Sequence, residues 1–115
     1  MGRVIDDDIL ASHRQELRRG TAALACLTLL ATEADYGYNL IGRLEALGIE
    51  IEANTLYPLL RRLEKQELLS SEWDTTESRP RKFYRTSAQG RALIELLRRD
   101  WDALTHAINQ IGQTS

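Results

Sequence analysis

The strongest constraint on the fold is one amphipathic stretch, residues 55–69, which reads TLYPLLRRLEKQELL. On a helix with about 100° per residue, its leucines gather on one side and its cations on the other. Proline removes one helical hydrogen bond and is cheap only near a helix start, so Pro58 predicts a start at about Ala53 or Asn54. The expected buried stripe consists of Leu56, Leu59, Leu60 and Leu63. The stretch therefore predicts a helix that packs on one side and offers a polar face on the other.

Three further helices are expected before this stretch. The first covers residues 6–18, where acidic residues suit the start and arginines suit the end. A nearly all-apolar helix, typical of a central position in a core, follows with Thr21 as its N-cap. A third helix is capped by Asp35, carries a leucine and isoleucine stripe as far as Leu47, and is ended by Gly48.

After the stretch, residues 67–87 have two β-prone ends around a polar middle, which predicts a β-hairpin with a long tip. A three-helix unit followed by a hairpin is the winged helix-turn-helix arrangement, whose last helix of the unit enters a DNA major groove. We therefore expect a mainly α protein, a winged helix-turn-helix with an N-terminal helix and a C-terminal dimerisation helix. The expected division is a DNA-binding domain over residues 1–86 and a dimerisation helix over residues 87–115.

The final helix carries an apolar seam. It is expected to start at a cap formed by Thr86 or Ser87, with Gln89 in a capping box, and to run to about Ile111. Spacings that alternate between three and four residues are typical of a coiled-coil seam. The seam residues are Leu93, Leu97, Trp101, Leu104, Ile108 and Ile111, of which the first five are expected to form the dimer interface. We expect self-association through this seam, with the first helix packing across it; the alternative is a helix that folds back on its own core.

The basic residues are concentrated in two elements, although the 115-residue chain has a formal net charge of -2. Residues 54–66 and 79–85 hold seven Lys or Arg and one acidic residue, Glu64. Paired basic elements in this layout favour phosphate contacts on double-stranded DNA. On the helix, Arg61, Lys65 and Asn54 are expected to read bases. Phosphate contacts are expected from Thr55, Tyr57, Arg62, Arg79, Arg81 and Lys82. An ordinary solvated helix face and a salt-bridged hairpin remain as alternatives.

Other chemistry is poorly supported by the sequence. His13 and His106 are far apart and lack partners at a metal-ligand spacing, and no catalytic or phosphate-cradling motif is present. We therefore expect no enzyme, no metal and no cofactor. Cys26, the one cysteine, lies in an apolar run and is expected to be buried and inert. Without a membrane-length apolar run or a signal-peptide pattern, the protein is expected to be cytoplasmic, with no membrane partner.

Three segments together resemble the motifs of the PadR family of bacterial transcriptional regulators. They read LRRGTAALACLTLLATEADYGYNLIGRLEALG, TLYPLLRRLEKQELL and RPRKFYRTSAQGRALI. The resemblance implies a dimeric winged-helix repressor that binds a dyad-symmetric operator and is released by a small, often aromatic or drug-like ligand. It also implies that Thr55, Tyr57 and Pro58 lie at the DNA-facing start of the recognition helix, and that two copies of Trp101 flank an inducer cavity.

These inferences lead to one main hypothesis and one alternative. The main hypothesis is a homodimeric DNA-binding repressor with a palindromic operator. The alternative is a winged-helix module that binds protein and not DNA, which the acidic net charge permits.

Overall fold

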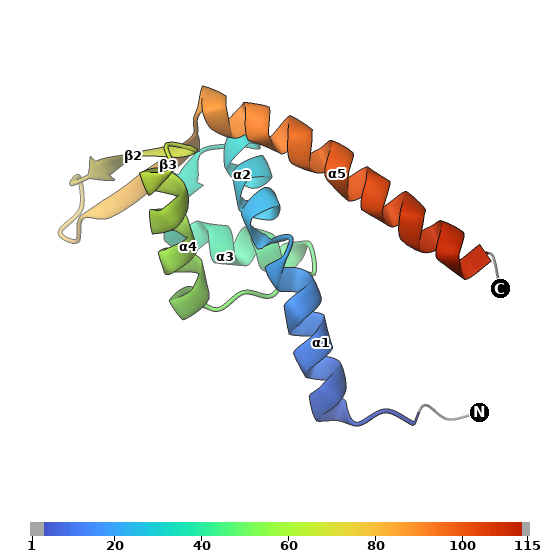
Figure 1. The fold of residues 1–115 in the computed structure, drawn as a ribbon. Coiled ribbons are helices and arrows are strands. Elements are labelled where there is room, and N and C mark those ends of the chain that lie inside the picture. The colour runs from blue at the N-terminus through green and yellow to red at the C-terminus, as the bar shows by residue number, and fades with distance from the viewer. Residues whose placement is uncertain (1–3, 114–115) are drawn as a thin grey trace.

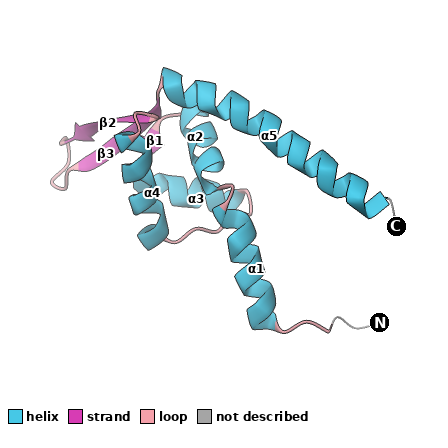
Figure 2. Ribbon diagram, in the orientation of Figure 1, coloured by secondary structure: helices cyan, strands magenta, loops and turns pink. Residues whose placement is uncertain are grey.

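The computed structural model describes residues 4–113, so the outermost residues of both expected domains, 1–3 and 114–115, lie outside the described part. The order of elements is the expected one with an additional short strand (Figures 1 and 2). The elements are α1 (Asp7–Arg19), α2 (Ala22–Thr32), β1 (Asp35–Tyr36), α3 (Gly37–Ala46), α4 (Ala53–Lys65), β2 (Leu69–Asp74), β3 (Arg81–Thr86) and α5 (Ala88–Gln113).

The molecule consists of a compact body with two arms. Helices α2, α3 and α4 form the body with a three-stranded antiparallel sheet in the order β1-β3-β2. Helices α1 and α5 extend from this body in Figure 1, and the described chain measures 58 × 31 × 21 Å. The mainly helical winged helix-turn-helix fold predicted from the sequence is confirmed.

The core is made almost entirely of leucine. The predicted stripe of α4 is buried as expected, and Leu56 and Leu60 are fully inaccessible to solvent. These side chains meet buried leucines of α2 and α3, and complete burial of one leucine stabilises a fold by roughly 1.5 to 3 kcal/mol. Cys26 belongs to the same cluster, and burial raises the pKa of its thiol to about 12. The prediction that Cys26 is buried is therefore confirmed.

Helix α2 joins the other elements through its carbonyl groups as well as its apolar surface. The Thr86 hydroxyl of β3 donates to the carbonyl of Leu27, in the middle of α2, at 2.7 Å. The last carbonyls of a helix have no partner within it. The Arg91 guanidinium of α5 donates to the carbonyl of Ala31 at 3.0 Å. Strand β3 and the start of α5 are thereby fixed on the central helix.

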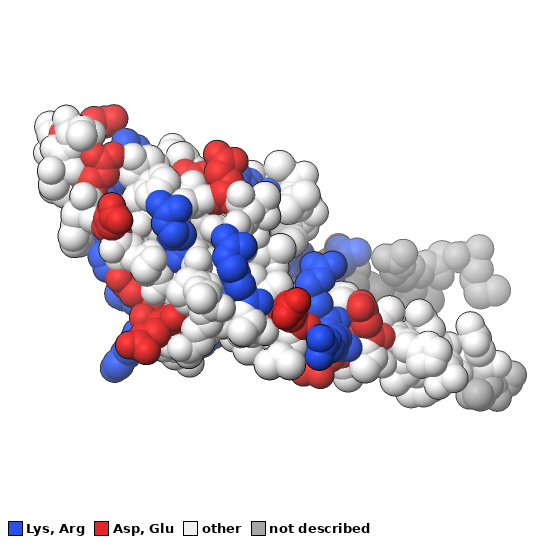
Figure 3. Space-filling view, turned by 90° about the horizontal axis from the view of Figure 1, so that it is seen from above, with Lys and Arg blue, Asp and Glu red and all other residues white. Residues whose placement is uncertain are grey.

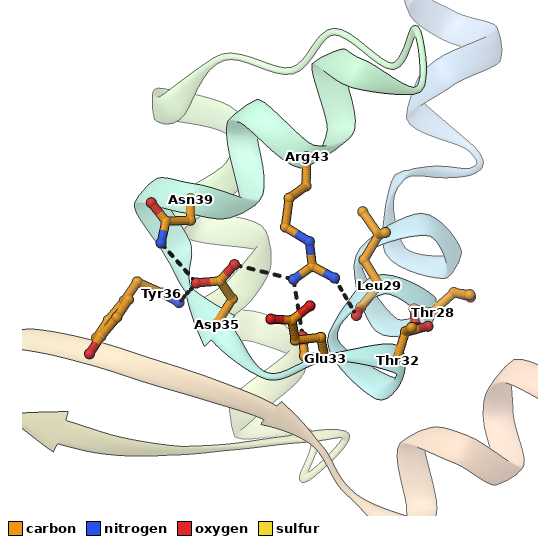
Figure 4. A network of polar contacts seen from close by, with 8 residues as sticks. All are labelled: Thr28, Leu29, Thr32, Glu33, Asp35, Tyr36, Asn39 and Arg43. Atoms are coloured by element: carbon orange, nitrogen blue, oxygen red, sulfur yellow. Dashed lines mark hydrogen bonds and ion pairs between the residues drawn. The ribbon is translucent and has the colours of Figure 1, made fainter.

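A polar network fixes the corner between α2 and α3 (Figure 4). The Arg43 guanidinium donates to the backbone carbonyls of Leu29 and Glu33, both at 3.0 Å, and pairs with Asp35 at 3.3 Å. The other Asp35 oxygen accepts from the Tyr36 amide at 2.8 Å and the Asn39 side chain at 2.9 Å. One arginine and one aspartate thus hold the end of α2, strand β1 and the first turn of α3 together.

Helix boundaries were predicted well, and Thr21 and Gly48 have the expected places. Thr21 occupies the N-cap position of α2, although its hydroxyl donates backwards to the Arg18 carbonyl at 3.0 Å. Gly48 follows α3 with a φ of +81°, the left-handed conformation that ends helices and favours glycine. The Asp35 prediction was shifted by one residue, because α3 begins at Gly37 and Tyr36 occupies its N-cap position.

Three local predictions were wrong. Leu47 is 64% exposed, because α3 ends before it and the turn carries it away from the stripe. Ser87, one of the two predicted caps, does cap α5, since its hydroxyl accepts from the Gly90 amide at 3.0 Å; the capping box with Gln89 does not form, because Gln89 donates to the carbonyl of Gln66. Strand β1 was missed, since it is only two residues long and depends on pairing with β3.

Candidate nucleic-acid interface

The polar face of α4 is exposed as the sequence predicted. The helix begins at Ala53, where the backbone amide groups of Thr55 and Leu56 donate to the Glu52 carbonyl at 3.0 and 2.9 Å. The exposed residues of this face are Asn54, Thr55, Pro58, Arg61, Arg62 and Lys65. The candidate recognition residues therefore lie together on one solvent-facing surface, opposite the leucine stripe.

Tyr57 differs from its neighbours because it is half-buried and packs against α3. A Cβ atom on Gly37 would lie only 2.9 Å from the Cε1 atom of Tyr57 and 3.2 Å from the Cδ1 atom of Leu60. Glycine at this position therefore allows the two helices of the helix-turn-helix unit to approach closely. Tyr57 fixes how α4 is presented, in addition to the phosphate contact expected of it.

The hairpin of β2 and β3 forms a wing beside α4. Its last cross-strand pairs are Trp73 with Lys82 and Asp74 with Arg81. The tip, residues 75–80, is exposed throughout and carries Arg79. Within the described residues 4–113, no ion pair involves Arg79, so this cation at the wing tip is available to a partner.

Arg81 lies on one face of the wing, over the ring of Tyr36. Its guanidinium carbon is 4.1 Å from the ring centroid, and the group pairs with Glu77 at 3.2 Å. The Tyr36 hydroxyl donates to Asp74, and this bond is the main reason why the pKa of Asp74 falls to about 2. The same bond raises the pKa of Tyr36. Strand β1 is thus joined to the far strand of the wing across β3.

Lys82 lies on the opposite face of the wing and points to α4. Its ammonium group pairs with Glu64 at 3.0 Å, and the Ser71 hydroxyl donates to the other carboxylate oxygen. The hydrogen bond from Ser71 is the largest cause that holds the pKa of Glu64 below its usual value, followed by Lys82. Sequence reasoning kept a salt-bridged hairpin as an alternative but did not predict that Glu64 of α4 would be the partner of Lys82.

On the upper face (Figure 3), the charged side chains of the described residues 4–113 are of both signs. Figure 3 shows basic and acidic side chains close together over this face. The candidate DNA-contacting cations are instead collected on α4 and on the wing, as the uneven charge distribution along the sequence indicated.

The two arms leave apolar side chains in solvent. At the start of α5, Leu93 and Ile94 pack against the core, so this part of the helix does fold back onto its own chain. Beyond them, Leu97 is half-buried and Trp101 is 47% exposed. The exposed residues of the seam continue with Leu104, Ile108 and Ile111. Helix α1 buries no residue and exposes Ile9 and Leu17, and Ile5, just before the helix, is exposed as well.

Residues 26–96 match the family described as the transcriptional regulator PadR-like family. The chain belongs to the PadR family. The match includes every residue of α4 and of the wing, and ends before Trp101. The resemblance inferred from the sequence is therefore confirmed, and PadR proteins are transcriptional regulators, not enzymes.

Individual relatives of this PadR-family chain agree. It is 33% identical over 94 residues to a protein of Mycobacterium tuberculosis named as a transcriptional regulator, covering 82% of this chain and 88% of that protein. A crystal structure of a PadR family transcriptional regulator from Eggerthella lenta has 47% identity and a TM-score of 0.90, covering 95% of this chain and 96% of that one. A PadR-like transcription factor from Bacteroides fragilis has 32% identity and a TM-score of 0.73, covering 87% and 98%.

The PadR-family chain also has a groove that sequence reasoning missed. It has a volume of about 910 Å³ and lies between α1, the start of α2, the loop after α3 and α4. Its charged lining mixes the arginines of α1 and α4 with three carboxylates, from Glu45, Glu50 and Glu52. The residues come from four separate segments, so no local motif could have indicated it.

Two expectations concern what the described part of the chain contains. No group of three or more metal-ligating side chains occurs among residues 4–113, and His13 and His106 are both exposed. No helix in that same range is long and apolar enough to cross a membrane.

Proposed function

We propose that this PadR-family chain is a homodimeric repressor that binds a palindromic operator and is released by a small ligand. The observation that carries the DNA-binding part is the exposed polar face of α4 beside a wing with Arg79 at its tip. Residues 1–86 would form the DNA-binding domain, and residues 87–115 the dimerisation helix.

The residues of α4 would have two roles in the complex. Arg61 and Lys65 would read base edges from the middle and end of the helix, with Asn54 at its start. Thr55, Tyr57 and Arg62 would hold phosphates, and Pro58 would lie at the DNA-facing start of the helix.

The wing would add backbone contacts. Arg79 is exposed and would contact a phosphate directly. Arg81 would release the exposed Glu77 carboxylate and bind a phosphate in its place. Lys82 differs from these two because Glu64 already holds its ammonium group on the α4 side of the wing.

Dimerisation would proceed through α5. In a single chain, apolar side chains of the seam from Leu97 to Ile108 are exposed to solvent. Pairing of two copies of α5 would bury them. The exposed residues of α1 would pack across this seam. The two-fold axis would then place two copies of α4 roughly 34 Å apart, which matches one turn of DNA and a palindromic site.

The ligand would bind beside Trp101. Two copies of this half-exposed ring near the dimer axis would offer flat apolar surfaces to an aromatic or drug-like molecule. Quenching of tryptophan emission by a library of aromatic compounds, in the protein and in a Trp101→Phe variant, tests this part. Equal quenching in both proteins would exclude a site at Trp101.

Selection from a random duplex library tests the DNA-binding function directly. We expect the protein to enrich palindromic sequences with half-sites one helical turn apart. Failure to enrich any duplex, combined with capture of a defined protein partner, would favour the alternative of a protein-binding winged-helix module.

A further inference from the structure

Lys82 and Glu64 form a link between the helix proposed to read DNA and the wing proposed to hold its backbone. Glu64 lies one residue before the end of α4, and Lys82 is the second residue of β3. Their charged atoms are 3.0 Å apart although 18 positions separate them in the chain. The pair therefore exists only because the hairpin folds back over α4.

The register of the wing explains why these groups meet. Side chains at alternate positions of a strand share a face, and directly paired residues also share one. Trp73 pairs with Lys82, and Ser71 pairs with Tyr84, so all four side chains lie on the face towards α4. Glu64 accepts from Ser71 on β2 and from Lys82 on β3, and thereby contacts both strands of the wing.

The ammonium group of Lys82 is enclosed on several sides. Its nitrogen lies 5.6 Å from the centroid of the Trp73 ring and 5.9 Å from that of Tyr84, within the range of cation–π attraction. The side chains of Lys82 and Glu64 are each only 29% exposed. A phosphate contact would require the ammonium group to leave a carboxylate and two rings, whereas Arg79 has no such partner among the described residues.

We propose that Lys82 is a positioning residue and not a phosphate ligand, and that Glu64 and Lys82 fix the angle between α4 and the wing. This inference rests on the proposed DNA-binding function. Base reading by α4 and backbone contact by the wing must occur together on one duplex, so their relative angle decides which sites fit both.

The two faces of the wing are held by separate groups. Tyr36 and Asp74 join the opposite face to β1, and the Glu64–Lys82 pair joins the inner face to α4. The short connection between α4 and β2 adds a third constraint, because the Leu68 amide donates to the Leu63 carbonyl at 2.9 Å. The exposed tip around Arg79 lies beyond all three constraints, which suits an element that adapts to the DNA backbone.

Salt dependence separates positioning from phosphate binding. The slope of log affinity against log salt concentration falls by about one for each phosphate that the protein no longer binds. The probe is a duplex that the wild-type protein selects from a random library, and Arg79→Met calibrates the removal of one phosphate-binding cation. For Lys82→Met we expect affinity to fall roughly 3- to 10-fold with an unchanged slope. A slope reduced by about one would overturn the inference.

Substitution of Glu64 is expected to change DNA affinity in opposite directions under the two interpretations of the Glu64–Lys82 pair. Removal of a negative charge near DNA raises affinity if that charge only repels phosphates. We expect Glu64→Gln to lower affinity by about the same factor as Lys82→Met, with the double variant no weaker than either single one. The exchanged pair, Glu64→Lys with Lys82→Glu, should recover part of the affinity. Higher affinity in Glu64→Gln, or additive losses in the double variant, would overturn the inference.

A measurement without DNA distinguishes failure of this inference from failure of the proposed function. The chain has two tryptophans, so a Trp101→Phe background leaves Trp73 beside Lys82 as the only reporter. We expect Glu64→Gln and Lys82→Met to increase the quenching of Trp73 by acrylamide to a similar extent. If Trp73 is unaffected by both, the link is absent; if the wild-type protein enriches no duplex, the DNA-binding function fails instead.

Discussion

The body and the arms of this molecule use similar apolar residues with different results. Leu60 of α4 is fully buried among other leucines, whereas Leu104 of α5 is 61% exposed. In the body, α2, α3, α4 and the sheet cover one another, so most of their leucine side chains are buried within one chain. In the arms, α1 buries no residue and α5 buries only Gly90. The body therefore stabilises the single chain. The exposed apolar side chains of the arms are suited to pack against another protein surface, such as a second copy of the chain.

The largest expected difference between body and arms is in the free energy of unfolding after truncation of one leucine in each. Leu60→Ala removes a fully buried side chain and should lower the free energy of unfolding by about 2 to 5 kcal/mol. Leu104→Ala should change the unfolding of the isolated chain far less, because its side chain is already in solvent. Denaturant unfolding at low protein concentration measures both, and equal losses would mean that the arm is packed within its own chain.

A charge at Trp101 should separate the subunits without unfolding the body. Trp101→Asp places a carboxylate at the expected centre of the seam, and removal of such an aromatic side chain from an interface commonly costs about 2 kcal/mol or more. We expect a folded monomer in sedimentation at micromolar concentration, with weakened operator binding. Trp101→Phe serves as the control and should remain dimeric. A Trp101→Asp protein that is still a dimer would show that another surface joins the subunits.

Removal of a cation should weaken DNA binding when the cation lies on α4 of the body, and should have little effect when it lies on α5. Arg61→Ala or Lys65→Ala should weaken binding to the selected duplex by about 1 to 3 kcal/mol while leaving stability unchanged, since both side chains are exposed on α4. Arg98→Ala, which changes an exposed arginine on α5, is the matched control and should bind normally. Wild-type affinity in both α4 variants would remove α4 from the role of recognition helix.

The smallest expected effect is the loss of stability of the contact between the wing and the body at low pH. The pKa of Asp74 is lowered to about 2 in the folded chain, below its usual value of 3.8, because the carboxylate accepts from Tyr36 and Thr76. Its contribution to stability is therefore complete above about pH 4 and is lost as the pH falls towards 2. Trp73 fluorescence in the Trp101→Phe background should report this loss. Asp74→Asn should remove the part of the pH dependence that is due to Asp74 and leave the part due to Glu64, whose pKa is also lowered; a transition near neutral pH would require a different group.

Local patterns in the sequence were sufficient for most of the fold. The leucine stripe of α4, the end of α3 at Gly48 and the hairpin were correct because burial, glycine conformation and strand propensity act over a few neighbouring residues. The exposed face of α4 followed from the same periodicity. Predictions failed where a distant partner decided the outcome, as in the two-residue strand β1 and in Gln89, which donates to the Gln66 carbonyl and forms no capping box.

The sequence by itself therefore determined which elements form, which side of α4 is buried and which family the chain resembles. Only the tertiary structure decided which charges are free. Arg79 and Lys82 are both cations of one hairpin, yet folding leaves the first in solvent and places the second between Glu64 and two aromatic rings. The physical reason is that a charge pair depends on distances of a few ångströms between residues far apart in the chain, and such distances are set by packing and not by spacing along the sequence.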